Sequence, residues 1–440
     1  MDDQTITYAI AGIIASYFLG HVLARKFDPF APVWLFLVGY VQVYVVQATS
    51  YREWGINTRG VQLVTSANLR ALWALLWFLA VYHMPIGSWL AARLPRPPRS
   101  WPPSLIVALT PPLVIWGLYC SRLSLADSSE VLTPEQVLLR SFPFLMMVAA
   151  VMLIVTGRSI QAPRPAFLIA GLMASAFYTV IWMFNGKRSP ALIGVLATVC
   201  AWYISRLRRP SWPVLFATSC AGVLVVAIAI GWRNNPNYEA SMAGFVQYLS
   251  EFDPQKIRES LNLGEEEDKD FITHESTEYG GFLLMMDTVP MKADYDYGAN
   301  YIRTFSTFIP RIVWPDKPIF GRAKWQAAWV AGSEIDREED FTSPAIGILG
   351  AAQLNGGALG TLIVISCVAL LQRTAYQFFR RYQDQLWVQF WWAITYFNAW
   401  FMVVNDDPMV WFYYNWGYTT FPIVALLWVA CRFVDSQTSA

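Results

Sequence analysis

The stretch that decides the fold is Pro213-Val-Leu-Phe-Ala-Thr-Ser-Cys-Ala-Gly-Val-Leu-Val-Val-Ala-Ile-Ala-Ile-Gly-Trp232, which contains no charged side chain. A helix that crosses the hydrocarbon layer needs roughly 17 to 25 consecutive, mostly apolar residues. The stretch meets this length and is flanked by charge, with Arg209 before it and Arg233 after it. It therefore predicts a transmembrane helix.

Ten further stretches of the chain have the same character. Hydrophobic residues make up 55% of the sequence and charged residues only 14%, which is too apolar for the surface of a soluble protein of this length. We expect an all-α polytopic membrane protein with about 11 transmembrane helices, within a range of 10 to 12. The predicted spans are 7–24, 30–48, 70–92, 103–120, 140–157, 165–184, 190–206, 213–232, 345–371, 386–404 and 409–431. The third, fourth and ninth contain Pro or Gly that can kink or split a helix.

Composition also limits the cofactors and partners that we expect. The five cysteines lie in or at the ends of apolar runs without metal-ligand spacing, so we expect neither zinc nor disulfides. The formal net charge of +1 gives no indication of a nucleic-acid partner. The chain has no phosphate-binding loop and no dinucleotide fingerprint, which argues against a nucleotide-driven activity. The N-terminal residues lack the basic region of a cleavable signal, so the first apolar run is interpreted as a retained helix.

Charged residues in the loops predict the orientation, because Lys and Arg are retained on the cytoplasmic side of a membrane. If the loop containing Arg25 and Lys26 is cytoplasmic, fourteen Lys and Arg residues lie inside and eight lie in the outside loops or at the start of the long polar insertion. This orientation places the insertion, residues 233–344, outside the membrane. The expected domains are an N-terminal bundle at 1–232, an extracytoplasmic domain at 233–344, and C-terminal transmembrane helices at 345–440.

The insertion is acidic, with 20 Asp and Glu against 11 Lys and Arg, and it contains the candidates for acid–base chemistry. His274, Glu275 and Glu278 are candidate general bases, since a histidine beside carboxylates suits proton transfer near neutral pH. The same residues also suit an ordinary solvated surface. Asp294 and Asp296 form a short Asp-x-Asp pattern of the kind that holds a metal and a donor phosphate, or a solvated loop, and we expect no metal. Residues 240–262 are typical of an amphipathic surface helix. The apolar run 280–286 predicts a short re-entrant or interfacial helix.

A basic island lies in this acidic insertion, in Thr307-Phe-Ile-Pro-Arg-Ile-Val-Trp-Pro-Asp-Lys-Pro318 and its neighbours. Three prolines predict a rigid extended or turned segment. Guanidinium and ammonium groups on a rigid segment suit a phosphate group, or alternatively anionic lipid headgroups. Two tryptophans can stack on a sugar ring or anchor at the membrane interface. The candidate anion ligands are Arg303, Arg311, Lys317 and Arg322, with Arg188 in the separate turn 185–190, and the tryptophans are Trp314 and Trp325.

The layout of spans, the late outward loop, the Gly186-Lys-Arg-Ser turn and the run Phe308-Ile-Pro-Arg-Ile-Val-Trp-Pro-Asp-Lys-Pro318 together resemble the Wzy-type O-antigen and exopolysaccharide polymerases. The small-residue run 347–360 is similar to the helix that follows the loop in that family. The resemblance implies a GT-C-like glycosyltransferase in the bacterial inner membrane that takes part in lipopolysaccharide or exopolysaccharide synthesis. Such an enzyme transfers a glycan from undecaprenyl diphosphate onto a lipid-linked repeat unit at the periplasmic face, without metal or nucleotide sugar. Its partners are membrane lipid and a chain-length regulator.

By the same resemblance, Arg188, Arg311 and Lys317 match the positions that bind the donor diphosphate. The base has no counterpart in a family motif, so His274, Glu275 and Glu278 stay equal candidates. Two alternatives remain open. An O-antigen ligase or another glycosyltransferase that uses lipid-linked sugars shares the outward chemistry, and a lipid-linked oligosaccharide flippase requires a charged cavity among the spans.

Overall fold

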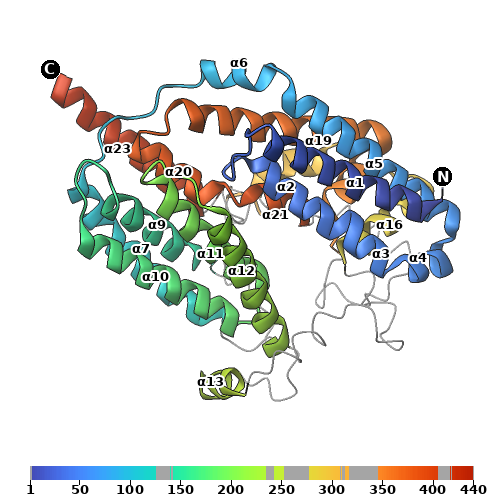
Figure 1. Cartoon of the computed structure of the whole chain (residues 1–440), viewed down its shortest axis with the longest axis horizontal. Helices are drawn as coiled ribbons and strands as arrows, with labels where there is room; N and C mark the ends of the chain where they lie inside the picture. The colour runs from blue at the N-terminus through green and yellow to red at the C-terminus, as the bar shows by residue number, and fades with distance from the viewer. Residues whose placement is uncertain are drawn as a thin grey trace. The chain divides into compact units, whose positions relative to one another are not determined.

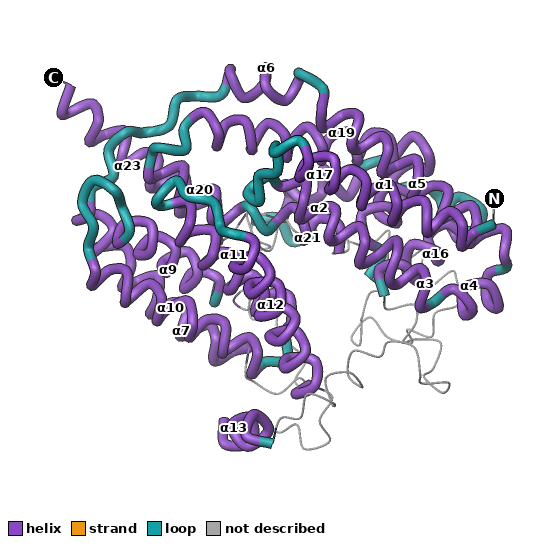
Figure 2. The backbone as a smooth tube through the Cα atoms, viewed as in Figure 1, coloured by secondary structure: helices purple, strands orange, loops and turns teal. Residues whose placement is uncertain are grey.

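The computed structural model describes residues 2–124, 139, 142–233, 242–251, 277–307, 309, 313–316, 345–404, 417 and 419–439. Within these residues the chain is helical and contains no β-strand (Figure 2). It divides into two compact units, whose helices are labelled in Figure 1. Unit 1 comprises residues 1–94, 264–378 and 398–413, and unit 2 comprises residues 95–263, 379–397 and 414–440.

Seven helices in the described part of the chain are long and apolar enough to cross a membrane. They are Asp3–Leu23, Pro32–Ser50, Val61–His83, Pro103–Ser121, Pro165–Phe184, Trp212–Arg233 and Gly347–Arg381. Two shorter apolar helices, Phe144–Gly157 and Arg188–Ile204, occupy the positions of the fifth and seventh predicted spans. The prediction of an all-helical, polytopic membrane protein is confirmed at this level.

Unit 1 is built from its N-terminal helices and from three later segments that pack among them. Its elements are α1 (Asp3–Leu23), α2 (Pro32–Val41), the π-helix η1 (Gln42–Gln47), α3 (Ala48–Ser50), α4 (Arg52–Arg59), α5 (Val61–His83), α6 (Ile86–Arg93), α16 (Glu278–Thr288), α17 (Ala299–Thr307), α21 (Asn398–Val404) and α19 (Gly347–Arg381) as far as residue 378. Local sequence sets several helix starts. The Asp2 side chain accepts a hydrogen bond from Thr5 N, and Pro32 occupies the first turn of α2, where a missing N–H costs nothing.

The third and tenth predicted spans differ from the helices in the structure, and the ninth is broken as predicted. The third span begins at Val61 instead of residue 70, and its helix ends before the separate α6. The tenth predicted span is not one helix, because α20 (Leu386–Thr395) ends before α21 begins at Asn398. The ninth span is broken at two glycines, as its composition predicted: Gly356 has φ 164° and ψ 28°, and Gly357 has φ 60° and ψ −128°.

Unit 2 surrounds one fully buried helix. Its elements are α7 (Pro103–Ser124), α9 (Phe144–Gly157), α10 (Pro165–Phe184), α11 (Arg188–Ile204), α12 (Trp212–Arg233), α13 (Met242–Ser250), α20 and α23 (Phe421–Ser439). Every residue of α9 is buried, and the helix packs against α7, α10, α11 and α20. The outer side of α10 exposes Ile169, Met173 and Phe177 at a spacing of four residues. Apolar side chains on both the inner and the outer face are typical of a helix that meets lipid.

Helix α13 confirms part of the predicted amphipathic segment. It covers residues 242–250, and the rest of the predicted range lies largely outside the described residues. Phe245 is only 1% exposed, and its ring packs against the rings of Phe184 and Trp232. Val246 on the other side is 58% exposed. The apolar side of α13 therefore packs against the end of the bundle in unit 2.

The expected division into N-terminal bundle, insertion and C-terminal helices concerns membrane topology and stays a prediction.

Candidate active site

The short helix α16 lies within the protein core of unit 1. Eleven residues at about 1.5 Å each give roughly 16 Å, too short to span a membrane. Tyr279, Phe282 and Leu283 are all 0% exposed, so α16 is buried in protein and does not lie along a surface. This burial argues against the predicted interfacial helix, and the alternative, a re-entrant helix, stays a prediction.

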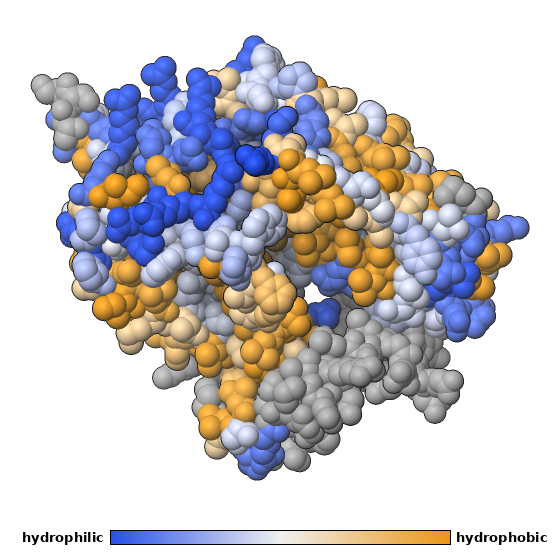
Figure 3. Space-filling model, viewed as in Figure 1, coloured by the Kyte–Doolittle hydropathy of each residue, from blue (hydrophilic) through white to orange (hydrophobic). Residues whose placement is uncertain are grey.

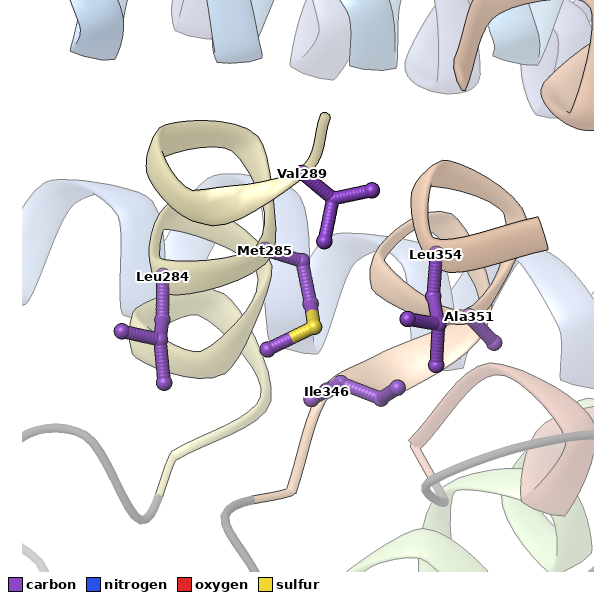
Figure 4. Packing of buried hydrophobic residues seen from close by; sticks show 6 residues of the cluster. All are labelled: Leu284, Met285, Val289, Ile346, Ala351 and Leu354. Atoms are coloured by element: carbon purple, nitrogen blue, oxygen red, sulfur yellow. The ribbon is translucent and has the colours of Figure 1, made fainter. Parts of the chain in front are cut away.

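The far side of α16 packs against the first half of α19. The apolar contact consists of Leu284, Met285 and Val289 from α16 and its end, and of Ile346, Ala351 and Leu354 from α19 and the residue before it (Figure 4). The two segments also approach closely at Gly281, where a Cβ atom would overlap the carbonyl group of Ala345. These contacts fix α16 and the start of α19 as one rigid pair, although 56 residues separate the end of α16 at Thr288 from Ala345.

The π-helix η1 presents two polar side chains to this pair. The Gln47 side chain donates from Nε2 to Glu278 Oε2 at 2.5 Å and accepts at Oε1 from Tyr279 N at 3.0 Å. Three residues earlier, the Tyr44 hydroxyl accepts a hydrogen bond from Leu349 N at 3.2 Å. Single π-helical turns inside α-helices are frequent at functional sites. Here the π-turn sets Tyr44 and Gln47 against the starts of both α19 and α16.

Glu278 is a buried carboxylate that forms no ion pair with a described cation. The residue is 7% exposed, and within the described residues no Lys, Arg or His forms a salt bridge with it. Burying a charge without a counter-ion is costly, so such groups are rare outside functional sites. Two features reduce the cost: Glu278 is the first residue of α16, where the helix dipole favours negative charge, and its Oε2 accepts the hydrogen bond from Gln47 Nε2. The carboxylate is thus held in place without an ion pair to any described residue.

The neighbouring residue ties α16 to the N-terminal helices. The Tyr279 hydroxyl donates to Asn68 Oδ1 at 2.7 Å, and Asn68 Nδ2 donates in turn to Thr7 Oγ1 at 3.2 Å. In the same helix as Thr7, Asp3 is 2% exposed and is paired with Arg52 through two hydrogen bonds. This network orients Tyr279, and through the α16 backbone it orients Glu278.

The opposite end of α16 carries a charged cluster. Asp287 Oδ2 accepts from Arg59 Nη1 and from Lys292 Nζ, each at 2.8 Å. Partial burial raises the pKa of the Asp287 carboxyl, but the Lys292 hydrogen bond and the Arg59 charge outweigh burial and hold that pKa below its ordinary value. Asp287 lies nine positions after Glu278, which is about 14 Å along a helix. The two groups therefore cannot act on the same atom.

A further cation lies well inside a membrane-spanning helix. Arg70, the tenth residue of α5, donates from Nη1 to Gln353 Oε1 at 2.9 Å and to Thr361 Oγ1 at 3.4 Å. These two acceptors flank the break of α19 at Gly356 and Gly357. The other N–H groups of Arg70 have no hydrogen-bond partner among the described residues, although a guanidinium has five donors. Charged side chains inside spans usually mark a binding site or a pathway.

The structure describes only some of the residues predicted for the site. Glu278 is in α16, as described above. Arg303 in α17 is paired with Asp296 at 3.0 Å, and Asp296 also accepts from Asn300 N, so the second acid of the Asp-x-Asp pattern serves local structure. Trp314 is 41% exposed, and Arg188 is the exposed first residue of α11 in unit 2. The remaining candidates, His274, Glu275, Arg311, Lys317, Arg322 and Trp325, lie outside the described residues.

Three residues of the site were missed from the sequence: Tyr44, Gln47 and Arg70. The predicted third span begins at residue 70 and so counts Arg70 among the eight outside cations, although Arg70 stands inside the mostly apolar stretch 61–83, and that position was a usable signal. Nothing in the sequence distinguished Gln47 from other polar residues near helix ends. The described residues contain no group of three or more His, Cys, Asp or Glu that could hold a metal ion. No protein-family model, curated protein or solved structure matches this chain.

Proposed function

We propose that this chain is a polysaccharide polymerase, a glycosyltransferase that moves a growing glycan from undecaprenyl diphosphate onto a lipid-linked oligosaccharide repeat unit. The observation that carries the proposal is the buried Glu278 carboxylate, which belongs to the long polar insertion, is held by Gln47, and forms no ion pair with a described residue. A carboxylate that is fixed but not neutralised is suited to accept a proton in a reaction.

In the proposed reaction, Glu278 takes the proton from a hydroxyl of the acceptor repeat unit. The freed oxygen attacks the anomeric carbon of the donor glycan. The bond between that carbon and the diphosphate oxygen breaks, and undecaprenyl diphosphate leaves with the electron pair. Positive groups near the leaving oxygens stabilise the charge that develops there. The proposal assigns this role to Arg311, Lys317 and Arg188, with Arg303 and Arg322 as further candidates and Trp314 and Trp325 as sugar platforms.

The proposal also includes the finer topology. About eleven spans in a GT-C-like arrangement would combine the seven long apolar helices with the shorter helices α9 and α11 and with the C-terminal helices. The insertion would face the periplasm of a bacterial inner membrane, as the loop charges suggest. Substrates with a polyprenyl tail reach such a site by diffusing within the bilayer.

The test uses the purified chain in liposomes with undecaprenyl-diphosphate-linked repeat units and neither nucleotide nor added metal. Dimers and longer glycans on the carrier are the expected products, and Glu278→Gln should remove them. Asp287→Asn is the matched control, because it makes the same chemical change at the other end of α16. Absence of any elongation by the wild-type chain refutes the polymerase. Transfer to a different acceptor, with no elongation, supports the ligase alternative.

A specific observation favours a second candidate, a lipid-linked oligosaccharide transporter. Arg70 lies within a span beside a broken helix, and discontinuous helices often form the substrate sites of transporters. In the same liposomes, movement of labelled lipid-linked repeat unit across the bilayer without elongation identifies a transporter. Arg70→Gln should then stop movement, whereas Glu278→Gln should leave it unchanged.

A further inference from the structure

Unit 2 contains a polar pocket that the proposed reaction does not use. Its volume is about 580 Å³, and it lies where α9 ends and where α7, α10 and α20 begin. Arg99 and Arg164 line it together with Ser159, Gln385 and Asp384. The walls therefore bring together two guanidinium groups, a hydroxyl, an amide and one carboxylate.

Several of these groups are without partners in the described structure. Ser159 is 4% exposed, yet its hydroxyl forms no hydrogen bond among the described residues. The Oε1 atom of Gln385 is buried and accepts no hydrogen bond. The guanidinium of Arg99 forms no ion pair with a described residue, and that of Arg164 rests 5.5 Å from the ring centre of Phe167. Buried polar groups are normally satisfied, so the unpartnered Gln385 Oε1, facing the same pocket as the exposed Arg99 and Arg164, indicates a bound molecule with both donors and acceptors.

The surrounding surface favours an anion. At this end of unit 2 the chain places ten arginines and no lysine against two aspartates, and Figure 3 shows hydrophilic surface gathered there. The arginines are Arg96, Arg99, Arg158, Arg164, Arg206, Arg208, Arg209, Arg380, Arg381 and Arg432, and the aspartates are Asp384 and Asp435. Asp435 is already engaged, because its carboxylate accepts from the backbone N–H groups of Arg99 and Ser100. Planar guanidinium groups bind phosphate oxygens in pairs, so a phosphate is the anion that best fits.

An apolar groove lies beside the polar pocket. The groove has a volume of about 670 Å³ and lies between α7 and α23, lined by Pro102, Leu105 and Phe433 among others. Trp101 lines the polar pocket and the next residue, Pro102, lines the groove, so the start of α7 forms the boundary between them. A polar pocket beside an apolar groove at the end of membrane helices suits an amphiphile.

We infer that unit 2 binds an anionic phospholipid whose headgroup joins a phosphate to hydroxyl groups, as in phosphatidylglycerol. The phosphate binds Arg99, Arg164 and the Ser159 hydroxyl. The headgroup hydroxyls donate to Gln385 Oε1 and to Asp384. One acyl chain occupies the groove beside α7. By the loop charges, the lipid belongs to the cytoplasmic leaflet, where basic pockets between helices bind anionic headgroups.

The experiment titrates the purified full-length chain in detergent with phosphatidylglycerol, phosphatidylcholine, glycerol phosphate and inorganic phosphate. Native mass spectrometry counts retained lipid, and the unfolding temperature gives the affinity. We expect retained phosphatidylglycerol and a rise in unfolding temperature with that lipid alone. Arg164→Gln and Ser159→Ala should each weaken its binding by about tenfold or more, since each removes a hydrogen bond to a charged group.

Two further variants distinguish binding in the pocket from general attraction of an anionic lipid to the basic surface. Arg208→Gln makes the same charge change at the same end of unit 2 but outside the pocket, and it should bind phosphatidylglycerol like the wild type. Gln385→Glu adds a negative charge inside the pocket and should reduce binding. Equal loss in Arg208→Gln and Arg164→Gln means diffuse attraction and overturns the site. Equal stabilisation by phosphatidylcholine, or by inorganic phosphate, overturns the assignment to an anionic lipid.

Discussion

Replacing Glu278 with glutamine removes a charge and a proton acceptor while keeping the shape of the side chain. The amide oxygen of the new residue can still accept the hydrogen bond that Gln47 donates at 2.5 Å. A positioned general base typically contributes a factor of about 10² to 10⁴ to a rate. At about 1.4 kcal/mol for each factor of ten, the loss of transition-state stabilisation is roughly 3–5 kcal/mol. Glycan elongation should therefore fall by at least about a hundredfold.

The same substitution should not destabilise the fold. Glu278 is 7% exposed with no salt bridge among the described residues, so its removal relieves an uncompensated buried charge. Gln47→Ala is the opposite case. It leaves Glu278 Oε2 and Tyr279 N without their partner, and each unsatisfied buried group costs about 1–3 kcal/mol. The expected loss of stability for Gln47→Ala is thus about 2–6 kcal/mol.

The assay compares initial rates of elongation and unfolding temperatures in one detergent. Glu278→Gln should be inactive and as stable as the wild type or more stable, and Asp287→Asn should retain most of the rate. A Glu278→Gln variant that elongates at the wild-type rate refutes the assignment of the base. If Glu278→Gln has an unfolding temperature as low as that of Gln47→Ala, the view that the Glu278 carboxylate is an uncompensated charge is refuted.

Three further outcomes test the packing and charges of unit 1. Gly281→Ala should lower stability by about 1–3 kcal/mol, because its Cβ would overlap the Ala345 carbonyl, whereas Gly12→Ala, with open space around it, should be neutral in the same thermal assay. Gly357→Ala should cost about 1–3 kcal/mol, since φ is 60° there, and a stability equal to wild type would contradict the break in α19. The folded-state pKa of Asp287 lies below 3.8, so its ion pairs stabilise above that value and are lost as pH falls through the lower folded-state pKa. Unfolding temperatures measured between about pH 6 and pH 3 should therefore decline less steeply for Asp287→Asn than for the wild type, and parallel curves would contradict this role.

Much of the helical framework could be predicted from single segments. A run such as 213–232 has to be helical in lipid because every backbone group must then be satisfied within the segment. The break in the ninth span followed from its glycines, and the short length of α16 followed from the polar residues on either side. The predicted start of the third span, at residue 70 and not at Val61, was wrong because Arg70 was counted among the charges outside the membrane. A single cation inside an apolar run is tolerated when partners such as Gln353 and Thr361 receive its N–H groups.

The candidate site was only partly predictable. Glu278 could be selected as one acid among many in an acidic insertion, but its burial depends on Gln47, which lies 231 residues earlier in the sequence. The cost of burying a charge is decided by what surrounds it, and those surroundings come from distant segments. For the same reason, the pocket of unit 2 has no sequence signature, since its two arginines, Arg99 and Arg164, precede different helices, α7 and α10.

By itself, the sequence determined that this protein is helical and embedded in a membrane, and which segments are apolar enough to cross. These properties depend on the free energy of transferring local stretches from water into lipid, so the sequence of each stretch is enough to predict whether it crosses the membrane. The tertiary structure decided which polar groups within those stretches are paired and which are not. It set Glu278 against Gln47 with no counter-ion among the described residues, and it turned Arg70 toward the broken helix α19. Pairing depends on contacts between residues far apart in the chain, and only the folded chain brings those residues together.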